Sequence, residues 1–396
     1  MIQIDRRRFL HALMGGACSA AAMPAFVPMS LASVPGDRRF VAILLRGAMD
    51  GLDAVQPYGD PLLRKLRRNL SGGPEKGALD LDGFFALHPA LSPLMPLWRS
   101  GELGFAHAVS TPYRDRRSHF DGQDILEAGT GGADIGSGPG AEMSSGWLNR
   151  LLPLIPGARF ETAYAVGTDQ LSILDGAAPH ASWSPESRLA LSTQAQRLLQ
   201  QIYESDAPFH SAAEAAIRIS AETAMPEANR GARDAEALAS FAADRLNRDT
   251  RIAAFSLTGW DTHRNQTAAL SEPLEVLAQT ILTLKRDLGR TWDDTVVMAM
   301  TEFGRTVREN GTRGTDHGTG GLMVMAGGAV KGRQVYGSWP GLGESDLYAG
   351  RDLMPTADVR SYAGAAISGL FGLSASDIET SIFPGLDFAA PPRILL

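Results

Sequence analysis

Hydrophobic residues in this chain gather into short, nearly unbroken runs that are separated by polar segments. The strongest runs are residues 40–45, 103–109, 251–257, 295–300 and 322–326, and 160–166 is a weaker one. Short apolar runs without alternation are typical of strands buried on both faces, as in a parallel sheet. The pattern therefore predicts a central sheet whose two faces are both covered.

Helical spacing appears between these runs. The clearest apolar stripe alternates steps of four and three residues through Leu270, Leu274, Leu277, Ile281, Leu284 and Leu288. It predicts an amphipathic helix that ends at Gly289. Strands that alternate with helices favour a doubly wound α/β architecture, and we expect residues 33–396 to form a single domain. Residues 187–248 are predicted to be a helical insertion, and the Gly- and Ser-rich residues 129–146 a long mobile loop.

Composition narrows the possible partners. The chain has 396 residues, enough for a large core, and a formal net charge of −7. This charge gives no overall attraction to nucleic acid or anionic membranes. We therefore expect no nucleic acid partner, and an anionic substrate would need a local basic patch.

The N-terminus has the pattern of an export signal. Residues 5–10, Asp-Arg-Arg-Arg-Phe-Leu, precede a mildly apolar stretch, and a cleavage site is plausible after Ala32. Residues 1–32 thus resemble a twin-arginine signal, which predicts the twin-arginine translocase as a partner and a periplasmic or extracellular location. Pro24 and Pro28 argue against a stable membrane span. The single cysteine, Cys18, lies inside this leader, so the mature chain would hold no disulfide and no thiolate ligand.

Acids, histidines and hydroxyls cluster in loops beside the predicted strands. The candidates are Asp50, Arg117, Ser118, His119, Asp261, His263, Glu302, Arg305, Asp316 and His317. Open α/β sheets place their sites at the carboxyl ends of the strands, so these side chains are expected to meet in one crevice. Carboxylate and imidazole groups are common metal ligands.

Each candidate also has a plain structural interpretation. Asp50 begins an Asp-Gly turn, Ser118 is suited to cap a helix, and His263 or His317 alone is more often a hydrogen-bonded structural residue. The recurrence of such residues beside strand ends is what favours a functional site.

These ordered loops resemble the alkaline-phosphatase-like superfamily of metal-dependent phospho- and sulfo-hydrolases. With residues 87–91, Leu-His-Pro-Ala-Leu, and 146–150, Gly-Trp-Leu-Asn-Arg, the chain more closely resembles an exported bacterial family, domain of unknown function fifteen-oh-one. The likeness runs from about residue 40 to about residue 372. It implies an α/β fold with a mostly parallel central sheet, helices on both faces and a helical insertion.

The resemblance also implies roles for single residues. Ser118 resembles the nucleophile, and Asp50, Asp261, His263, Glu302, Asp316 and His317 resemble ligands of a divalent metal, whether Zn, Mg, Mn or Ca. One site is complete from Asp261, His263 and His317. A second, from Asp50, Ser118 and Glu302 or Asp316, lacks an imidazole. His263 lies two residues after Asp261 where the superfamily has four, and Phe303 stands where a histidine is usual. His317 is either the late ligand or half of an Asp316–His317 pair.

The expected substrate is an anionic ester. Arg114, Arg116, Arg117 or Arg305 would bind its charged oxygens, and His119 would be an acid/base group, a ligand or a helix-cap residue. The chain is thus predicted to be an exported metal-dependent hydrolase or transferase acting on phosphate or sulfate esters. The alternative is a non-catalytic member of the fold that binds an envelope glycan or a partner protein.

Overall fold

The computed structural model describes residues 38–70, 72–114, 117–131, 145–184 and 232–396. The predicted export signal, residues 132–144 of the predicted loop and residues 187–231 of the predicted insertion lie outside these ranges. Arg116 also lies outside them.

All six predicted strands are present in one nine-stranded sheet, in the order β11-β5-β10-β9-β1-β8-β6-β7, with β14 paired to β5. Their bounds are β1 (Arg39–Leu45), β5 (Leu103–Ser110), β6 (Ala163–Val166), β7 (Ala181–Trp183), β8 (Ile252–Leu257), β9 (Thr295–Met300), β10 (Gly321–Ala326), β11 (Val335–Tyr336) and β14 (Ala357–Asp358). The α/β architecture with a mostly parallel sheet is therefore confirmed.

Strand direction changes at β10. Strands β9, β1, β8, β6 and β7 run parallel to one another, whereas β10 runs antiparallel to both β9 and β5. Residues 301–320 join β9 to β10 without the crossover helix that usually connects parallel strands. The apolar run at 322–326 identified a buried strand but held no information about its direction.

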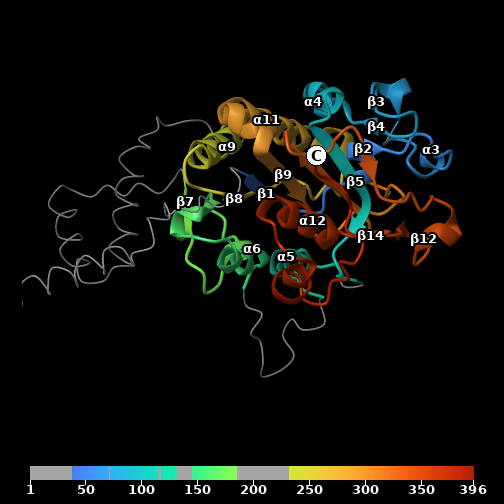
Figure 1. The fold of residues 1–396 in the computed structure, drawn as a ribbon. Helices are drawn as coiled ribbons and strands as arrows, with labels where there is room; N and C mark the ends of the chain where they lie inside the picture. Colours follow the sequence, from blue (N-terminus) through green and yellow to red (C-terminus); the bar gives the residue numbers. More distant parts are fainter. Residues whose placement is uncertain (1–37, 71, 115–116, 132–144, 185–231) are drawn as a thin grey trace, which may run out of the picture.

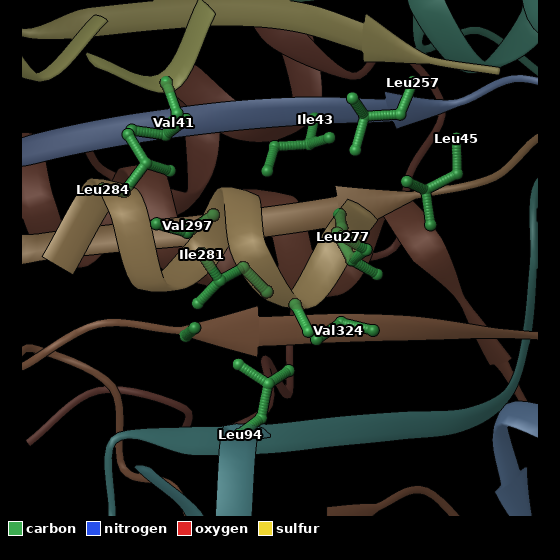
Figure 2. Close-up of a cluster of buried hydrophobic side chains, with 14 of the residues drawn as sticks. Val41, Ile43, Leu45, Leu94, Leu257, Leu277, Ile281, Leu284, Val297 and Val324 are labelled. Atoms are coloured by element: carbon green, nitrogen blue, oxygen red, sulfur yellow. The ribbon is translucent and has the colours of Figure 1, made fainter. Parts of the chain in front are cut away.

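The sheet is covered on both faces (Figure 1). Along β1, Val41, Ile43 and Leu45 belong to one core cluster and the alternate residues to the other. Figure 2 shows the first cluster, where β1, β9 and β10 pack against a long helix. The opposite cluster contains residues of α6 (Trp147–Leu151) and α12 (Val359–Phe371). Alternation along a strand thus fills both layers.

The long helix is α11 (Ser271–Leu288), which the leucine stripe predicted. The side chains of Leu274, Leu277, Ile281 and Leu284 are fully buried. The helix ends before Gly289, whose φ of 56° is a conformation that glycine adopts without strain. Helix α9 (Ala232–Leu246) packs beside it and is the described part of the predicted insertion.

The remaining helices and strands are short, and no helix in the described ranges is long and apolar enough to cross a membrane. They are α2 (Gly51–Ala54), β2 (Val55–Gln56), α3 (Leu63–Leu66), β3 (Leu79–Asp80), β4 (Ala86–Leu87), α4 (Met95–Ser100), α5 (His119–Ala128), α10 (Gln266–Ala269), β12 (Leu347–Tyr348) and β13 (Asp352–Leu353).

One edge of the sheet gathers the candidate loops. Strands β1, β5, β8 and β9 all end at this edge, and β10 begins there because it runs the other way. The loops that follow β1, β5, β8 and β9 and the segment that precedes β10 therefore lie close together in space.

Candidate metal centre

The loop after β8 is held firmly against the sheet. Trp260 is fully buried, and its indole N–H donates to the carbonyl of Leu257 over 2.9 Å. Gly47, with φ of 124°, lies so close that a Cβ there would come within 2.8 Å of the Asp261 nitrogen. A side chain at 47 would push the loops after β1 and β8 apart. These contacts fix the direction of the Asp261 carboxylate.

Three imidazoles converge on that carboxylate. Asp261 Oδ1 lies 2.9 Å from His263 Nε2, 3.2 Å from His317 Nε2 and 3.5 Å from His119 Nε2. The Nε2 atoms of His263 and His317 are 3.0 Å apart. The structure thus brings together the Asp261, His263 and His317 set expected from the sequence and adds His119 from the start of α5.

Each of these rings has its other nitrogen engaged. Nδ1 lies 2.7 Å from Glu302 Oε1 in His119, 3.3 Å from Asp316 Oδ1 in His263, and 2.9 Å from the Arg117 carbonyl oxygen in His317. Ionised carboxylates and carbonyls only accept hydrogen bonds, so each Nδ1 carries the proton. In the neutral rings, every Nε2 therefore presents a lone pair to the same point.

This arrangement fits a metal ion. Bonds of 2.0–2.1 Å at tetrahedral angles place ligand atoms roughly 3.3 Å apart, close to the separations of 2.9 to 3.5 Å seen around Asp261 Oδ1. His119 Nε2 is buried and has no hydrogen-bond partner. Within the described part of the chain, one ligand atom from each of His119, Asp261 and His317 lies within 4.8 Å of the other two. Histidine ligands whose second nitrogen is held by a carboxylate or carbonyl are typical of protein metal sites.

The charge state of the acids suits the same role. Burial favours the neutral form of Asp261, but its hydrogen bond from Arg305 and the charge of that guanidinium outweigh burial and hold the pKa below its ordinary value. Glu302 is also buried, and hydrogen bonds from His119 and Thr301 lower its pKa. The hydrogen bond that His119 donates to Glu302 in turn raises the pKa of His119, whereas burial lowers the pKa of His317.

Arg305 occupies a different place from the one the sequence suggested. Its side chain is fully buried, its Nη1 donates to Asp261 Oδ1 over 2.7 Å, and its Nε and Nη2 donate to Thr315. The guanidinium therefore orients a candidate ligand and faces protein on every side.

One side of the cluster is open to solvent. The side chain of Asp261 is 46% exposed and that of His263 is 40% exposed. Structural metal sites are closed, whereas catalytic sites keep a position for substrate. Phe303 is buried, and its ring stacks on His119 with centroids 5.2 Å apart. Phe303 thus forms a wall of the site.

Asp50 lies apart from this cluster, in a buried polar network. Arg67 Nη1 contacts both of its carboxylate oxygens, at 2.9 and 2.8 Å, and both side chains are almost completely buried. Gln266 and Thr315 also donate to Asp50 Oδ2. The guanidinium already neutralises the carboxylate, which leaves no evident need for a metal there.

The other candidates of the second expected site also contact different partners. Glu302 Oε1 accepts from the Gly47 N–H and holds His119, and Asp316 holds His263. Ser118 is the N-cap of α5, and its Oγ accepts from the Asp121 N–H over 3.4 Å. Helix capping was the structural alternative for this serine.

The amino-acid sequence does not reveal the buried network around Asp50, and it leaves three roles open for His119. Arg67 and Gln266 carry no local motif, and they reach Asp50 from 17 and 216 residues away. The position of His119, directly after an expected helix cap at a strand end, was the available signal for a ligand.

The sequence pattern of the family described as "Protein of unknown function (DUF1501)" matches residues 100–382. The chain belongs to the DUF1501 family. The matched part contains all four side chains of the cluster, whereas Asp50 and Arg67 precede it. No curated protein matches the chain.

Several solved structures resemble this DUF1501 chain at low identity. A protein in the alkaline phosphatase superfamily from Vibrio parahaemolyticus is 12% identical over 98% of this chain and 80% of its own, with a TM-score of 0.45. The soluble domain of lipooligosaccharide phosphoethanolamine transferase A from Neisseria meningitidis is 13% identical over 74% and 77%, with a TM-score of 0.37. A TAB5 alkaline phosphatase mutant with bound Mg is 13% identical over 73% and 90%, with a TM-score of 0.33. The activity of this chain is therefore inferred from its own side chains.

Proposed function

We propose that this DUF1501 protein is a metal-dependent hydrolase or transferase that acts on phosphate or sulfate esters. The observation that carries the proposal is the convergence of three imidazole Nε2 atoms and one carboxylate oxygen at a solvent-open sheet edge, with every Nδ1 engaged. His119, Asp261, His263 and His317 would hold the ion. Three nitrogen ligands and one oxygen favour zinc or a similar transition metal over Mg²⁺ or Ca²⁺, which prefer all-oxygen sites.

The remaining residues would support these ligands. Glu302 and Asp316 orient two imidazoles, and buried Arg305 keeps the Asp261 carboxylate ionised and directed. When bound, a metal of this kind polarises an ester oxygen and lowers the pKa of a nearby hydroxyl. Asp50 and its partner Arg67 would serve stability.

Ser118 is the proposed nucleophile. It directly precedes His119 at the N-terminus of α5, where helix N–H groups favour an anion. Within the described residues, its hydroxyl oxygen accepts the long hydrogen bond from the Asp121 N–H, and its own proton has no acceptor. In the proposed step, Oγ loses its proton and bonds to phosphorus or sulfur as the bond to the leaving alcohol oxygen breaks, and that oxygen takes up a proton. In a second displacement, water frees the serine, or an acceptor alcohol does so in a transferase.

We place this activity outside the cytoplasm. The twin-arginine pattern of residues 6–8 supports export by the twin-arginine translocase, and the absence of cysteine after Cys18 is compatible with a protein that folds and takes up its metal before export.

The test begins with metal analysis of purified mature protein. We expect one transition metal ion per chain in the wild type and in His180→Ala, a histidine outside the cluster, and loss of the ion in His263→Ala. Metal-loaded protein is then assayed with phosphomonoester, phosphodiester and sulfate-ester substrates.

Ser118→Ala separates the two parts of the proposal. It should keep the metal and lose turnover. Turnover that survives both Ser118→Ala and Asp261→Ala would exclude this site as the active site. A loaded protein that turns over no ester would favour the alternative, a binder with one structural metal.

A further inference from the structure

Two arginines lie directly beside the cluster and share a single acid. Arg117 Nη2 lies 3.5 Å from Asp352 Oδ2, and Arg351 Nη1 donates to Asp352 Oδ1 over 2.7 Å. Asp352 is fully buried, whereas each arginine side chain is 37% exposed. Asp352 thus supplies one negative charge against the two positive charges of these guanidiniums.

Both arginines are fixed to a candidate metal ligand. The Arg117 carbonyl accepts from His317 Nδ1 over 2.9 Å, and Arg351 Nη1 donates to the His317 carbonyl over 2.9 Å. The arginines therefore flank one residue of the cluster, although they come from different segments. Arg117 precedes α5, and Arg351 closes the β12–β13 hairpin.

The backbone at Arg117 supports a functional placement. Its φ is 56°, a left-handed conformation that is uncommon for a residue other than glycine, and such strain is concentrated at functional sites. Within the described part of the chain, no hydrogen bond engages the Nε and Nη1 of Arg117 or the Nε and Nη2 of Arg351. Each guanidinium thus keeps donors for an anion, which arginine binds through paired N–H groups.

We propose that Arg117 and Arg351 form an oxyanion clamp that holds the phosphate or sulfate group of the substrate next to His317. Buried Asp352 is the positioning residue, because it fixes both guanidiniums, and Thr319 Oγ1 fixes Asp352 in turn over 2.9 Å. The inference rests on the proposed function for its substrate class. It adds Arg351, a hairpin residue that carries no motif, and it assigns the clamp to this pair instead of to buried Arg305.

Binding of inorganic phosphate and of inorganic sulfate to the metal-loaded mature chain tests the clamp without any turnover. Calorimetric titration should show that Arg351→Gln and Arg117→Gln each weaken binding about tenfold or more, with metal content unchanged. Arg99→Gln removes the same charge from the exposed end of α4 and should bind like the wild type. Arg117→Gln tests the clamp even if Arg351→Gln fails to fold. The Arg117 contact with Asp352 is long, at 3.5 Å, so its loss should disturb the fold little.

The outcomes separate the clamp from the proposed function. If the loaded wild type binds either anion and both clamp variants lose it, the clamp is supported even when no ester is turned over. If esters are turned over, the variants should raise KM more than they lower kcat. Wild-type affinity in both clamp variants, or no anion binding by the loaded wild type, overturns the clamp.

Discussion

At the scale of single residues, neighbouring groups decide which candidates can serve as ligands. Asp261 and Asp50 both follow a buried strand in the sequence. In the structure Asp261 faces three imidazoles at the open edge, whereas Asp50 is buried against Arg67. His263 beside Asp261 favours that loop as a ligand loop, but nothing in the loop after β1 shows that Arg67 neutralises Asp50, because that partner comes from another part of the chain.

Asp50→Asn should destabilise the protein and leave the metal in place. Asparagine keeps the shape of the side chain but leaves the buried charge of Arg67 without a counter-charge. This loss lowers the free energy of unfolding by about 3–5 kcal/mol. Urea unfolding measures the change, and metal analysis of the folded fraction should still find one ion per chain. The double variant with Arg67→Met should recover much of the loss, since both charges are then gone. A folded Asp50→Asn protein that had lost metal would show that Asp50 is a ligand.

Glu302→Gln should weaken metal binding while the fold persists. Glutamine still fills the space beside His119 but offers a neutral acceptor to its Nδ1, and loss of such a partner typically lowers metal affinity about 10–100-fold. Competition with a chelator of known affinity measures the effect. Glu309→Gln, which alters a carboxylate that contacts Asn69, is the matched control. Equal affinity in the two variants would contradict the orienting role of Glu302.

At the scale of elements, helix α5 carries one candidate ligand, His119, at its start and a buried acid, Glu127, near its end. His119 begins the helix, and Glu127 lies near its end, almost completely buried and 2.8 Å from Arg46 Nη2. Burial raises the pKa of Glu127 to about 7, although the charge of Arg46 opposes this shift. The folded protein therefore binds this proton more tightly than the unfolded chain does.

This raised pKa predicts how stability depends on pH. The contribution of Glu127 is complete below its ordinary pKa of 4.5 and is lost as the pH rises through about 7. Glu127→Gln does not titrate, so between pH 4.5 and pH 8 it should gain about 3 kcal/mol relative to the wild type. Denaturant unfolding at several pH values measures the difference, with Glu344→Gln at an exposed position as control. Parallel curves for wild type and Glu127→Gln would refute the prediction.

Elements were predicted well where local pattern decides their formation. The leucine stripe gave α11 and its end at Gly289, because amphipathic spacing and a glycine terminus act within the helix itself. The direction of β10 was not predictable from its own run of residues. It depends on the connection from β9, whose loop lies so close to the segment before β10 that a Cβ at Gly304 would come within 1.8 Å of the Gly320 oxygen.

At the scale of the whole molecule, a bound metal would link distant parts of the fold. His119 starts α5, Asp261 and His263 follow β8, and His317 precedes β10. An ion that binds only the folded state stabilises it by mass action, by about 4 kcal/mol at a thousand times its Kd.

Removal of metal should therefore lower the thermal midpoint of the wild type. Thermal unfolding with and without excess chelator measures this shift. His180→Ala should respond like the wild type, whereas His263→Ala should already unfold at the lower temperature and ignore the chelator. A wild-type midpoint that the chelator leaves unchanged would argue against a metal that bridges these segments.

The sequence alone determined six strands of the sheet, the main helix and the recurrence of acids and histidines beside strand ends, because these depend on periodicity and on neighbours along the chain. The tertiary structure decided which of those residues meet. It brought His119 together with Asp261, His263 and His317. It paired Asp50 with Arg67, and it placed Arg351 and Arg117 on the same acid, Asp352. These pairings are set by sheet order and strand direction, which bring together residues more than two hundred positions apart and leave no signature in any one segment.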